Sequence, residues 1–408
     1  MRLPHLQRRG TANRRFPGTA RVVLGALLAI AAAGCWPYVV APAYGFPRPS
    51  AFSGPRLWNP YANAHGRWWK ANFHAHTEAW GGLTAGHSSV ADVRRIYRKL
   101  GYDIVGLSNY QQIDGGGRSD PDFIPIYEHG YNVRKVHELV IGAKRVTWLD
   151  FPFGQTLSNK QYVLNRLDRN GGIVAIAHPW LRNGYPASQL RYLTGYTLME
   201  VVRQGQVGTR RWDAALSAGH LSWIIADDDE HNLDLHHDVG VSWTMVMAPS
   251  RSRKDVLAAL RAGHTYGVVG KRGVNEILVR DVSLRGDTLV VRTSPGAHLF
   301  RFVGQGGVLK KTVRASEQAR YVIQPDDNYV RVEIVARHTR IYLNPIIRYS
   351  GADPTQPKAA LSPGGTWANR GMMAAWALLL IGVPRLTSAT WRKKARDARS
   401  RPDDELHM

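Results

Sequence analysis

The chain of 408 residues carries 54 Lys and Arg against 31 Asp and Glu, a formal net charge of +23. A hydrophobic fraction of 44%, with 13 Trp and 17 Tyr, is enough for sizeable cores and excludes a mainly disordered chain. A single cysteine excludes an intrachain disulfide framework and a zinc ribbon built on cysteine. Any chemistry must therefore come from the 16 histidines, the carboxylates and the hydroxyls.

The N-terminal segment has the charge pattern of an export signal or a membrane anchor. Residues 1–21 contain six arginines and no acid, and residues 22–47 carry no charge. A positive flank before an apolar run is typical of both kinds of segment. We therefore expect a basic cytoplasmic tail and a signal or anchor helix within 1–43. This helix is retained as a transmembrane helix, cleaved after Ala41-Pro42-Ala43, or lipidated at Cys35.

The C-terminal segment repeats this pattern. Gly371–Pro384 is a run of 14 uncharged residues, about 21 Å of helix and shorter than a ~30 Å hydrocarbon core. We expect a second membrane helix over 366–391 that includes flanking residues; a helix lying at the membrane surface is the alternative. The tail 392–408 is basic, so the positive-inside tendency places both tails in the cytoplasm. The body is then held at the cell membrane on its outer side, periplasmic or extracellular.

The body between the two tails is also basic. Such a surface favours anionic partners, here a phosphorylated small molecule or an envelope substrate, in addition to the membrane itself. No recognised nucleic-acid-binding motif is present, so no nucleic acid partner is expected.

Strands and helices alternate over residues 69–272, after a linker over 44–68. The expected elements are, in chain order, a strand over 69–76, a helix over Ser88–Leu100, a strand over Tyr102–Leu107, a helix over Ser158–Leu167, strands over Ile173–Ala177 and Leu198–Val202, a helix over Thr209–Ser217, strands over Leu221–Ala226 and Val241–Met247, and a helix over Ser252–Ala262 closed by Gly263. In the first of these helices Ser88 or Ser89 can serve as the cap, and the apolar residues from Val90 to Leu100 recur on one face. The alternation predicts an α/β fold with a mainly parallel sheet or a barrel.

The pattern changes to short strands separated by Gly, Asp and Asn turns over residues 273–350. The expected strands are Ile277–Val282, Thr288–Arg292, His298–Val303, Tyr321–Ile323, Tyr329–Ala336 and Ile341–Tyr349. We expect no helix between them, which predicts a small antiparallel β-sandwich followed by a linker over 351–365.

Four groups of histidines and carboxylates lie at or near the ends of expected strands. They are His74 with His76; Glu128, His129 and His137; His178; and the run from Asp227 to His231. Barrels place functional groups at the C-terminal ends of strands, where they converge on one mouth. Each group alone is explained equally well by ordinary core or surface residues. Together, without cysteine, they predict one shared site for zinc, manganese or iron.

The motifs HAHT, GYDIVGLS, YEHG…HELVIG, GGIVAIAHP and ADDDEH occur in an order that resembles the polymerase-and-histidinol-phosphatase (PHP) family, over residues 69–270. The later NYVRVEI…IYLNPIIR resembles the β-rich C-terminal part of PHP proteins of the carbaryl-hydrolase type. The resemblance implies a distorted (β/α)7 barrel holding two or three divalent metals. Family members cleave phosphate esters, and some cleave carbamate or carboxyl esters.

Position by position, the resemblance implies a set of metal ligands in this chain: His74, His76, Glu128, His137, His178, Asp229 and His231. Glu128 is the expected bridging carboxylate, and His87 falls where some members place a further ligand. His129 is expected to lie beside the ligands rather than on a metal. Asp227 and Asp228 are expected to orient ligand histidines.

One motif departs from the family pattern. Where members read Thr-Asp-His, this chain has Ser108-Asn109-Tyr110. An amide and a phenol are poorer ligands than a carboxylate and an imidazole, so we expect two metals rather than three. Asn109 and Tyr110 are instead candidates for contact with the substrate, with Tyr110 also a candidate weak acid. Arg182 and Arg203 are candidates for binding the substrate anion.

The leading functional hypothesis is a membrane-tethered, metal-dependent phosphoesterase in which a metal-activated water attacks phosphorus. A carboxyl-ester or carbamate hydrolase with the same site is one alternative. A non-catalytic, PHP-like binding protein of the envelope is another.

Overall fold

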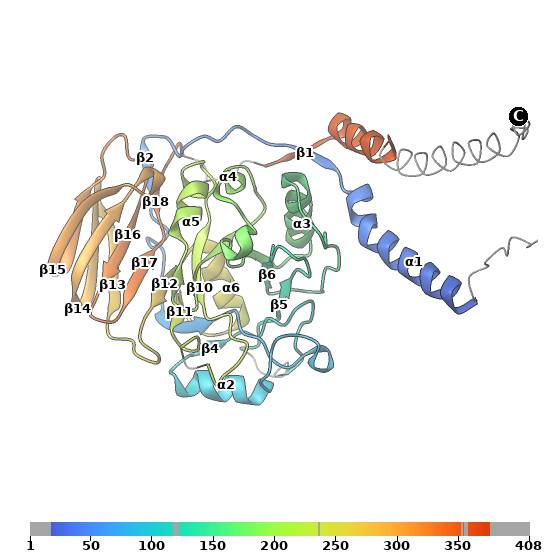
Figure 1. Ribbon diagram of the computed structural model, residues 1–408. Helices are drawn as coiled ribbons and strands as arrows, with labels where there is room; N and C mark the ends of the chain where they lie inside the picture. The colour runs from blue at the N-terminus through green and yellow to red at the C-terminus, as the bar shows by residue number, and fades with distance from the viewer. Residues whose placement is uncertain (1–17, 117–121, 236, 352–353, 355–357, 376–408) are drawn as a thin grey trace, which may run out of the picture.

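The computed structural model describes residues 18–116, 122–235, 237–351, 354 and 358–375. The body consists of two β-sheets with helices packed around them, and the helix α1 (Gly18–Val40) extends away from one side of it (Figure 1). A helix over 363–375 leaves the body on the same side (Figure 1).

The first sheet contains six strands in the order β10-β8-β7-β6-β5, with β9 paired to β8. Their bounds are β5 Ile126–His129, β6 Glu138–Ile141, β7 Ile173–Ile176, β8 Leu198–Arg203, β9 Gln206–Val207 and β10 Trp223–Asp227. The pairs β10–β8 and β7–β8 are parallel, whereas β5–β6 and β6–β7 are antiparallel. Every residue of β5, β6, β7 and β10 is buried, as expected for strands that are covered on both faces.

The second sheet contains eleven strands, with the main order β13-β14-β16-β17-β12-β11-β3-β4. Its bounds are β2 Arg56–Trp58, β3 Arg67–Asn72, β4 Ile104–Val105, β11 Ser242–Ala248, β12 Thr265–Val269, β13 Leu278–Arg285, β14 Thr288–Val303, β15 Leu309–Val322, β16 Tyr329–Val335, β17 Arg340–Leu343 and β18 Ile346–Tyr349. Strand β15 pairs with β14, and β18 pairs with β16 and β2. A separate pair joins β1 (Ala43–Gly45) to β19 (Ala360–Ser362), so both ends of the body are tied together.

The remaining helices are α2 Val90–Lys99, α3 Leu157–Arg169, α4 Ala187–Leu190, α5 Thr209–Leu216 and α6 Arg253–Ala262, with short 3₁₀ turns at Trp80–Gly82, Leu181–Asn183 and Gln305–Gly307. Four of these helices match the expected ranges to within a few residues, whereas α4 was not expected. Ser89 and Ser252 each accept a hydrogen bond from a backbone N–H of the first turn. Gly263 ends α6 in the left-handed conformation that glycine adopts without strain.

The sheets do not form the closed (β/α)7 barrel that the resemblance implies. The link between β5 and β6 spans only residues 130–137, too short for the helical crossover that a parallel pair requires. These two strands therefore pair antiparallel. The two sheets meet instead through isolated bridges between Ala75 and Glu230 and between Tyr110 and Glu128.

The strands after residue 273 are antiparallel, as expected, but they continue the second sheet. Strand β17 pairs with β12, with Tyr266 opposite Leu343. The two stretches expected as separate strands around residue 295 form one long strand, β14. Strand β15 begins at Leu309, well before the expected Tyr321. Its exposed first part carries mostly polar side chains, so it has no apolar pattern that would predict a strand.

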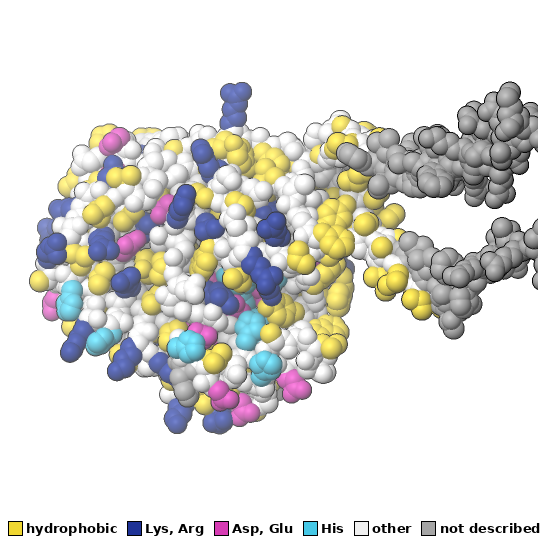
Figure 2. Space-filling view, viewed as in Figure 1, with side chains coloured by type: hydrophobic (Ala, Val, Ile, Leu, Met, Phe, Trp, Pro, Cys, Tyr) yellow, Lys and Arg dark blue, Asp and Glu magenta, His cyan; other side chains and the backbone are white. Residues whose placement is uncertain are grey.

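No helix within the described part of the chain is long and apolar enough to cross a membrane. Neither expected membrane helix is therefore confirmed, and the second, over 366–391, lies outside the described residues from 376 onward. Figure 2 shows Lys and Arg side chains spread over the visible face of the body. Hydrophobic side chains gather at its edge beneath the two terminal helices (Figure 2).

A buried ion pair fastens the second sheet to α5. Arg331 donates from Nε and Nη2 to the two carboxylate oxygens of Asp213, each at 2.8 Å, and both side chains are nearly fully buried. We expect Arg331→Met to destabilise the protein by about 3–5 kcal/mol, because the Asp213 charge is left buried without its partner. Urea unfolding monitored by tryptophan fluorescence measures this loss. Arg301→Met, at a half-exposed arginine 3.9 Å from Glu333, should change the stability by less than about 1 kcal/mol.

Candidate metal centre

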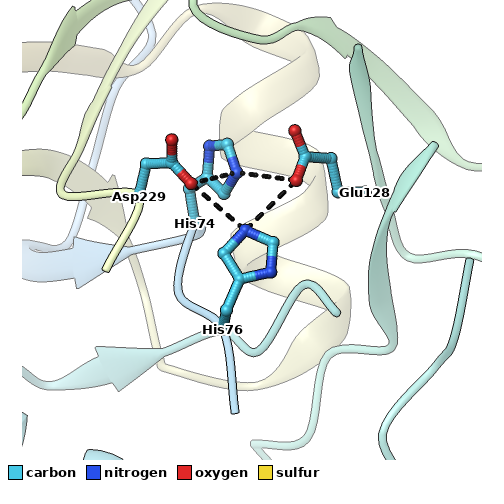
Figure 3. A group of neighbouring side chains, drawn as sticks. All are labelled: His74, His76, Glu128 and Asp229. Carbon is cyan, nitrogen blue, oxygen red and sulfur yellow. Dashed lines mark hydrogen bonds and ion pairs between the residues drawn. The ribbon is translucent and has the colours of Figure 1, made fainter. Parts of the chain in front are cut away.

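Four side chains from distant parts of the chain meet in one buried cluster (Figure 3). The Nε2 atoms of His74 and His76 lie 3.0 and 3.1 Å from Asp229 Oδ1. The same two nitrogens lie 3.4 and 3.1 Å from Glu128 Oε2. All four ligand atoms lie within 4.8 Å of one another.

This spacing fits a tetrahedral metal site. Ligand atoms placed ~2.0–2.1 Å from a zinc ion at the corners of a tetrahedron are about 3.3 Å apart. The four nitrogen–oxygen separations of the cluster run from 3.0 to 3.4 Å. In addition, His74 Nε2 and Glu128 Oε2 are buried but make no hydrogen bond with a described residue. These two atoms are therefore placed to bind a cation once the His74 imidazole has lost its proton.

Glu128 also belongs to a second group. Its other oxygen, Oε1, lies 2.5 Å from His137 Nδ1 and 3.1 Å from His178 Nε2. These three ligand atoms are buried and also lie within 4.8 Å of one another. The two oxygens of one carboxylate thus face two separate sets of ligands, which is the arrangement of a carboxylate that bridges two cations.

The strand ends carry these ligands into the same place. His74 and His76 follow β3, where Phe73 N donates to Asp227 Oδ1 at 2.6 Å and His76 N donates to Glu230 O at 2.8 Å. The segment after β3 is therefore held directly against the segment after β10. Glu128 comes from β5, and the bridge to Tyr110 holds it beside the end of β4.

Two of the predicted ligands have an unusual backbone conformation. His178 and Asp229 have φ values of +25° and +48°, in the region that residues other than glycine rarely adopt. Such conformations cost ~1–3 kcal/mol and persist where the surrounding structure enforces them, often at functional sites. Gly130 lies close by: a Cβ there would be 2.4 Å from His137 Cδ2, so only glycine leaves room for this imidazole.

Glu200 in β8 was not predicted from the sequence, yet it orients two of the predicted ligands. Its Oε1 lies 3.0 Å from His74 Nδ1, and its Oε2 accepts a hydrogen bond from the His178 backbone N–H at 2.6 Å. A fully buried carboxylate that holds the far nitrogen of an imidazole fixes its ring orientation and tautomer. The available signal was a single acid inside the otherwise apolar run LMEVV.

We expect Glu200→Gln to lower the affinity for the metal about 10–100-fold without unfolding the protein, because the His74 ring loses its carboxylate partner. Competition against a chromophoric chelator measures this affinity. Glu138→Gln is the matched control, since this buried carboxylate pairs with His129 and not with the cluster. Equal losses in both variants would contradict the role given to Glu200.

The charges of the cluster stabilise one another. Burial alone would raise the pKa of Glu128, but the imidazoles of His137 and His74 hold it well below its usual range. Burial alone would likewise lower the pKa of His74, but the carboxylates of Asp229, Glu200 and Glu128 hold it well above its usual range. Both carboxylates that face the cluster, Glu128 and Asp229, are therefore ionised at neutral pH.

The residues expected to support the ligands have other partners. Asp228 accepts hydrogen bonds from Tyr97 and from the backbone N–H groups of Gly240 and Ser242, so it orders that loop instead of orienting an imidazole. Asp227 accepts a hydrogen bond from the Phe73 N–H, just before His74 in the chain. The ring of His129 lies 2.8 Å from Glu138 and from the Leu149 carbonyl. Successive residues of a strand point to opposite faces, which separates His129 from its neighbour Glu128.

Of the motif Ser108-Asn109-Tyr110, which differs from the family pattern, Tyr110 lies at the cluster and Asn109 does not. The Asn109 amide accepts from the Thr77 N–H at 2.7 Å and donates to the Thr77 hydroxyl at 2.7 Å, so it holds the loop after His76. The Tyr110 ring stacks on His76 with the ring centroids 4.5 Å apart. Burial, followed by the charges of Glu128 and Asp229, raises the pKa of Tyr110, so its hydroxyl stays protonated.

Two predicted ligands lie outside both ligand groups. His231 Nε2 lies 3.3 Å from the Tyr110 hydroxyl, and its Nδ1 lies 2.8 Å from the Asp229 carbonyl oxygen. Burial lowers the pKa of His231 to about 4, so the imidazole is neutral at physiological pH. His87 is exposed, and its backbone N–H donates to the carbonyl of His231.

The two arginine candidates differ in position. Arg203 is largely buried and pairs through Nε with Asp229 Oδ2, so it reaches the edge of the cluster. Arg182 is exposed and donates to the carbonyl of Val133, away from the ligands.

Comparison of the sequence with protein families and with curated proteins finds no match. Among solved structures, the chain is similar to a two-domain protein from Bacteroides vulgatus that contains a predicted PHP-like metal-dependent phosphoesterase. The two are 12% identical, with a TM-score of 0.39, and the likeness covers 78% of this chain and 99% of that one. The resemblance of the C-terminal part to the carbaryl-hydrolase type stays a prediction.

Proposed function

We propose that the protein is a metal-dependent hydrolase of the PHP type that cleaves phosphate esters with two divalent cations, zinc, manganese or iron. His74, His76, Glu128 and Asp229 would hold one cation, and Glu128, His137 and His178 the other. The observation that supports this most directly is the shared use of Glu128, whose two oxygens face the two ligand sets. Bound in this way, such cations lower the pKa of water and neutralise charge on a phosphoryl group.

The surrounding side chains supply binding and proton donation. The Tyr110 hydroxyl is protonated and lies at the cluster, so it can donate a hydrogen bond to an ester or phosphoryl oxygen. In the structure neutral His231 accepts this proton at Nε2, 3.3 Å away, because its Nδ1 donates to the Asp229 carbonyl; a substrate oxygen would replace His231 as the acceptor. Lys135 lies with its Nζ 5.4 Å from the centre of the Tyr110 ring and adds positive charge there. Arg203 fixes the Asp229 carboxylate, which leaves Asp229 Oδ1 facing the histidines.

We further propose that the protein acts at the cell membrane with its body on the outer side. The six arginines of residues 1–21, the uncharged residues 22–47 and the basic C-terminal tail support this location. The basic body supports an anionic, phosphorylated substrate.

Elemental analysis and a substrate screen on the full chain test the proposal. We expect two divalent metals per chain and metal-dependent turnover of a generic phosphomonoester or phosphodiester. His74→Ala should abolish both. Turnover of carboxyl esters alone would contradict the phosphoesterase assignment. Full metal occupancy without turnover of any substrate would indicate a binding protein.

A further inference from the structure

An exposed apolar strip runs over the surface between α1 and the metal centre. We define the strip as Phe153, Val133, Tyr131, Trp148 and Trp80, whose side chains are 62%, 58%, 50%, 58% and 44% exposed. Val133 follows Tyr131 by two residues, and its N–H donates to the carbonyl of Pro152, next to Phe153, at 3.0 Å. Tyr131 donates its hydroxyl to the Trp148 carbonyl at 3.1 Å, and the rings of Trp148 and Trp80 lie 5.8 Å apart. A contiguous apolar surface of this kind on a globular protein usually marks an interaction site.

At one end the strip is continuous with α1. The Phe153 ring stacks on Tyr38 of α1 with the centroids 6.5 Å apart, and the Tyr38 hydroxyl accepts from the Phe153 N–H at 3.0 Å. Further apolar side chains of α1 are exposed: Val22, Val23, Leu27, Ile30, Trp36 and Val39. The helix over 363–375 lies beside the C-terminal end of α1, since Arg370 Nε donates to the Val39 carbonyl at 3.3 Å. Figure 2 shows hydrophobic side chains gathered along this edge of the body.

At the other end the strip reaches the metal centre. Trp80 Nε1 donates to the carbonyl of Tyr110 at 2.8 Å, and the Tyr110 ring stacks on the predicted ligand His76. Lys135 lies at this end of the strip, with its Nζ near the Tyr110 ring. A molecule lying along the strip would therefore have its polar end next to the Lys135 ammonium group and the ligand cluster.

We propose that the strip rests on the surface of a lipid bilayer, and that the substrate is an amphipathic phosphate ester whose apolar tail stays in that bilayer. The substrate part of this inference rests on the proposed function. Three of the five strip residues are Trp or Tyr, the residues that favour the boundary between lipid and water. Residues 1–17, which precede α1 in the chain, contain five arginines and no acid, and anionic lipid headgroups of the same bilayer would attract them.

The reaction balances with water as the only co-reactant. The water oxygen forms a bond to phosphorus, and the bond from phosphorus to the ester oxygen breaks. The ester oxygen leaves with a proton, so the lipid alcohol stays in the bilayer and the phosphate product is released to water.

A site-specific probe tests the docking without reference to activity. In the full chain carrying Cys35→Ser, the variants Phe153→Cys and Trp148→Cys are labelled with a polarity-sensitive fluorophore. Vesicles of equal parts phosphatidylcholine and phosphatidylglycerol should shift the emission of both labels to shorter wavelength. Leu309→Cys, an exposed position on β15, is the control and should show no shift. Equal shifts at all three positions, or none, would overturn the docking. A concentration-dependent shift without vesicles would indicate a second copy of the chain instead.

A second measurement tests the substrate class. The double variant Trp148→Ser with Phe153→Ser should hydrolyse a phosphate ester embedded in vesicles at least about tenfold more slowly than the parent chain. Its turnover of a soluble phosphate ester should change by less than about twofold, because neither residue contacts the ligand cluster. Val308→Ser with Leu309→Ser is the matched control, with neither rate changed. Equal losses on both substrates would overturn the substrate assignment. Absence of turnover on any phosphate ester, together with a label shift at positions 153 and 148, would contradict the proposed function and leave the docking supported.

Discussion

Replacing Glu128 with glutamine should lower the turnover of a phosphate ester about 10³-fold and reduce the number of metals bound. The amide keeps the size of the side chain but loses the charge that faces both ligand sets. Metal-assisted stabilisation contributes several kcal/mol to such reactions, and each ~1.4 kcal/mol is a factor of ten in rate. Steady-state kinetics together with elemental analysis of the purified variant measure both effects.

The control for this experiment is Glu138→Gln. Glu138 is equally buried and lies on the neighbouring strand β6, but its partners are His129 and Tyr185. The Glu138→Gln variant should keep both metals and most of the activity of the parent chain. If Glu128→Gln retained full metal content and turnover, the bridging role would be wrong.

The affinity for the metal should rise about tenfold per pH unit between roughly pH 6 and pH 8, for each proton that the metal displaces. In the metal-free protein, burial lowers the pKa of His74, but the nearby carboxylates outweigh it and hold this pKa well above its usual range. The His74 imidazole is therefore protonated at neutral pH and must lose its proton before Nε2 can bind a cation. Binding becomes tighter as the pH rises and levels off above the raised pKa.

Calorimetry in two buffers with different ionisation enthalpies gives the number of protons released, and titrations across this range give the slope. Glu200→Gln offers an internal test. It removes one of the carboxylates that raise the pKa of His74, so the rise in affinity should level off at a lower pH. An affinity that does not change with pH in the parent chain would show that no proton is displaced.

The sequence was sufficient for four helices of the body, α2, α3, α5 and α6. The cap at Ser88 or Ser89 and the terminal Gly263 placed α2 and α6 to within a few residues, because a capping hydrogen bond or a left-handed turn involves neighbours in the chain. Strand β15 was mostly missed, since an exposed edge strand has no apolar face to reveal it.

The partners of the site residues could not be predicted in the same way. Asn109 was a candidate for substrate contact, yet its amide is hydrogen-bonded to Thr77 and Asp114. Glu200 was not considered, although it lies 3.0 Å from a predicted ligand that is 126 residues away in the chain. Such pairs depend on which strands lie side by side, and spacing along the chain carries no information about that.

The sequence by itself determined the chemical character of this protein: its positive charge, its uncharged terminal segments, and a set of histidines and carboxylates that follow buried strands. Only the tertiary structure decided how they combine. It made β5 and β6 antiparallel, merged the C-terminal strands with the second sheet, and placed Glu128 between two ligand sets. The reason is that apolar periodicity records which face of an element is buried, whereas the neighbour against which it is buried is selected by packing of the whole chain.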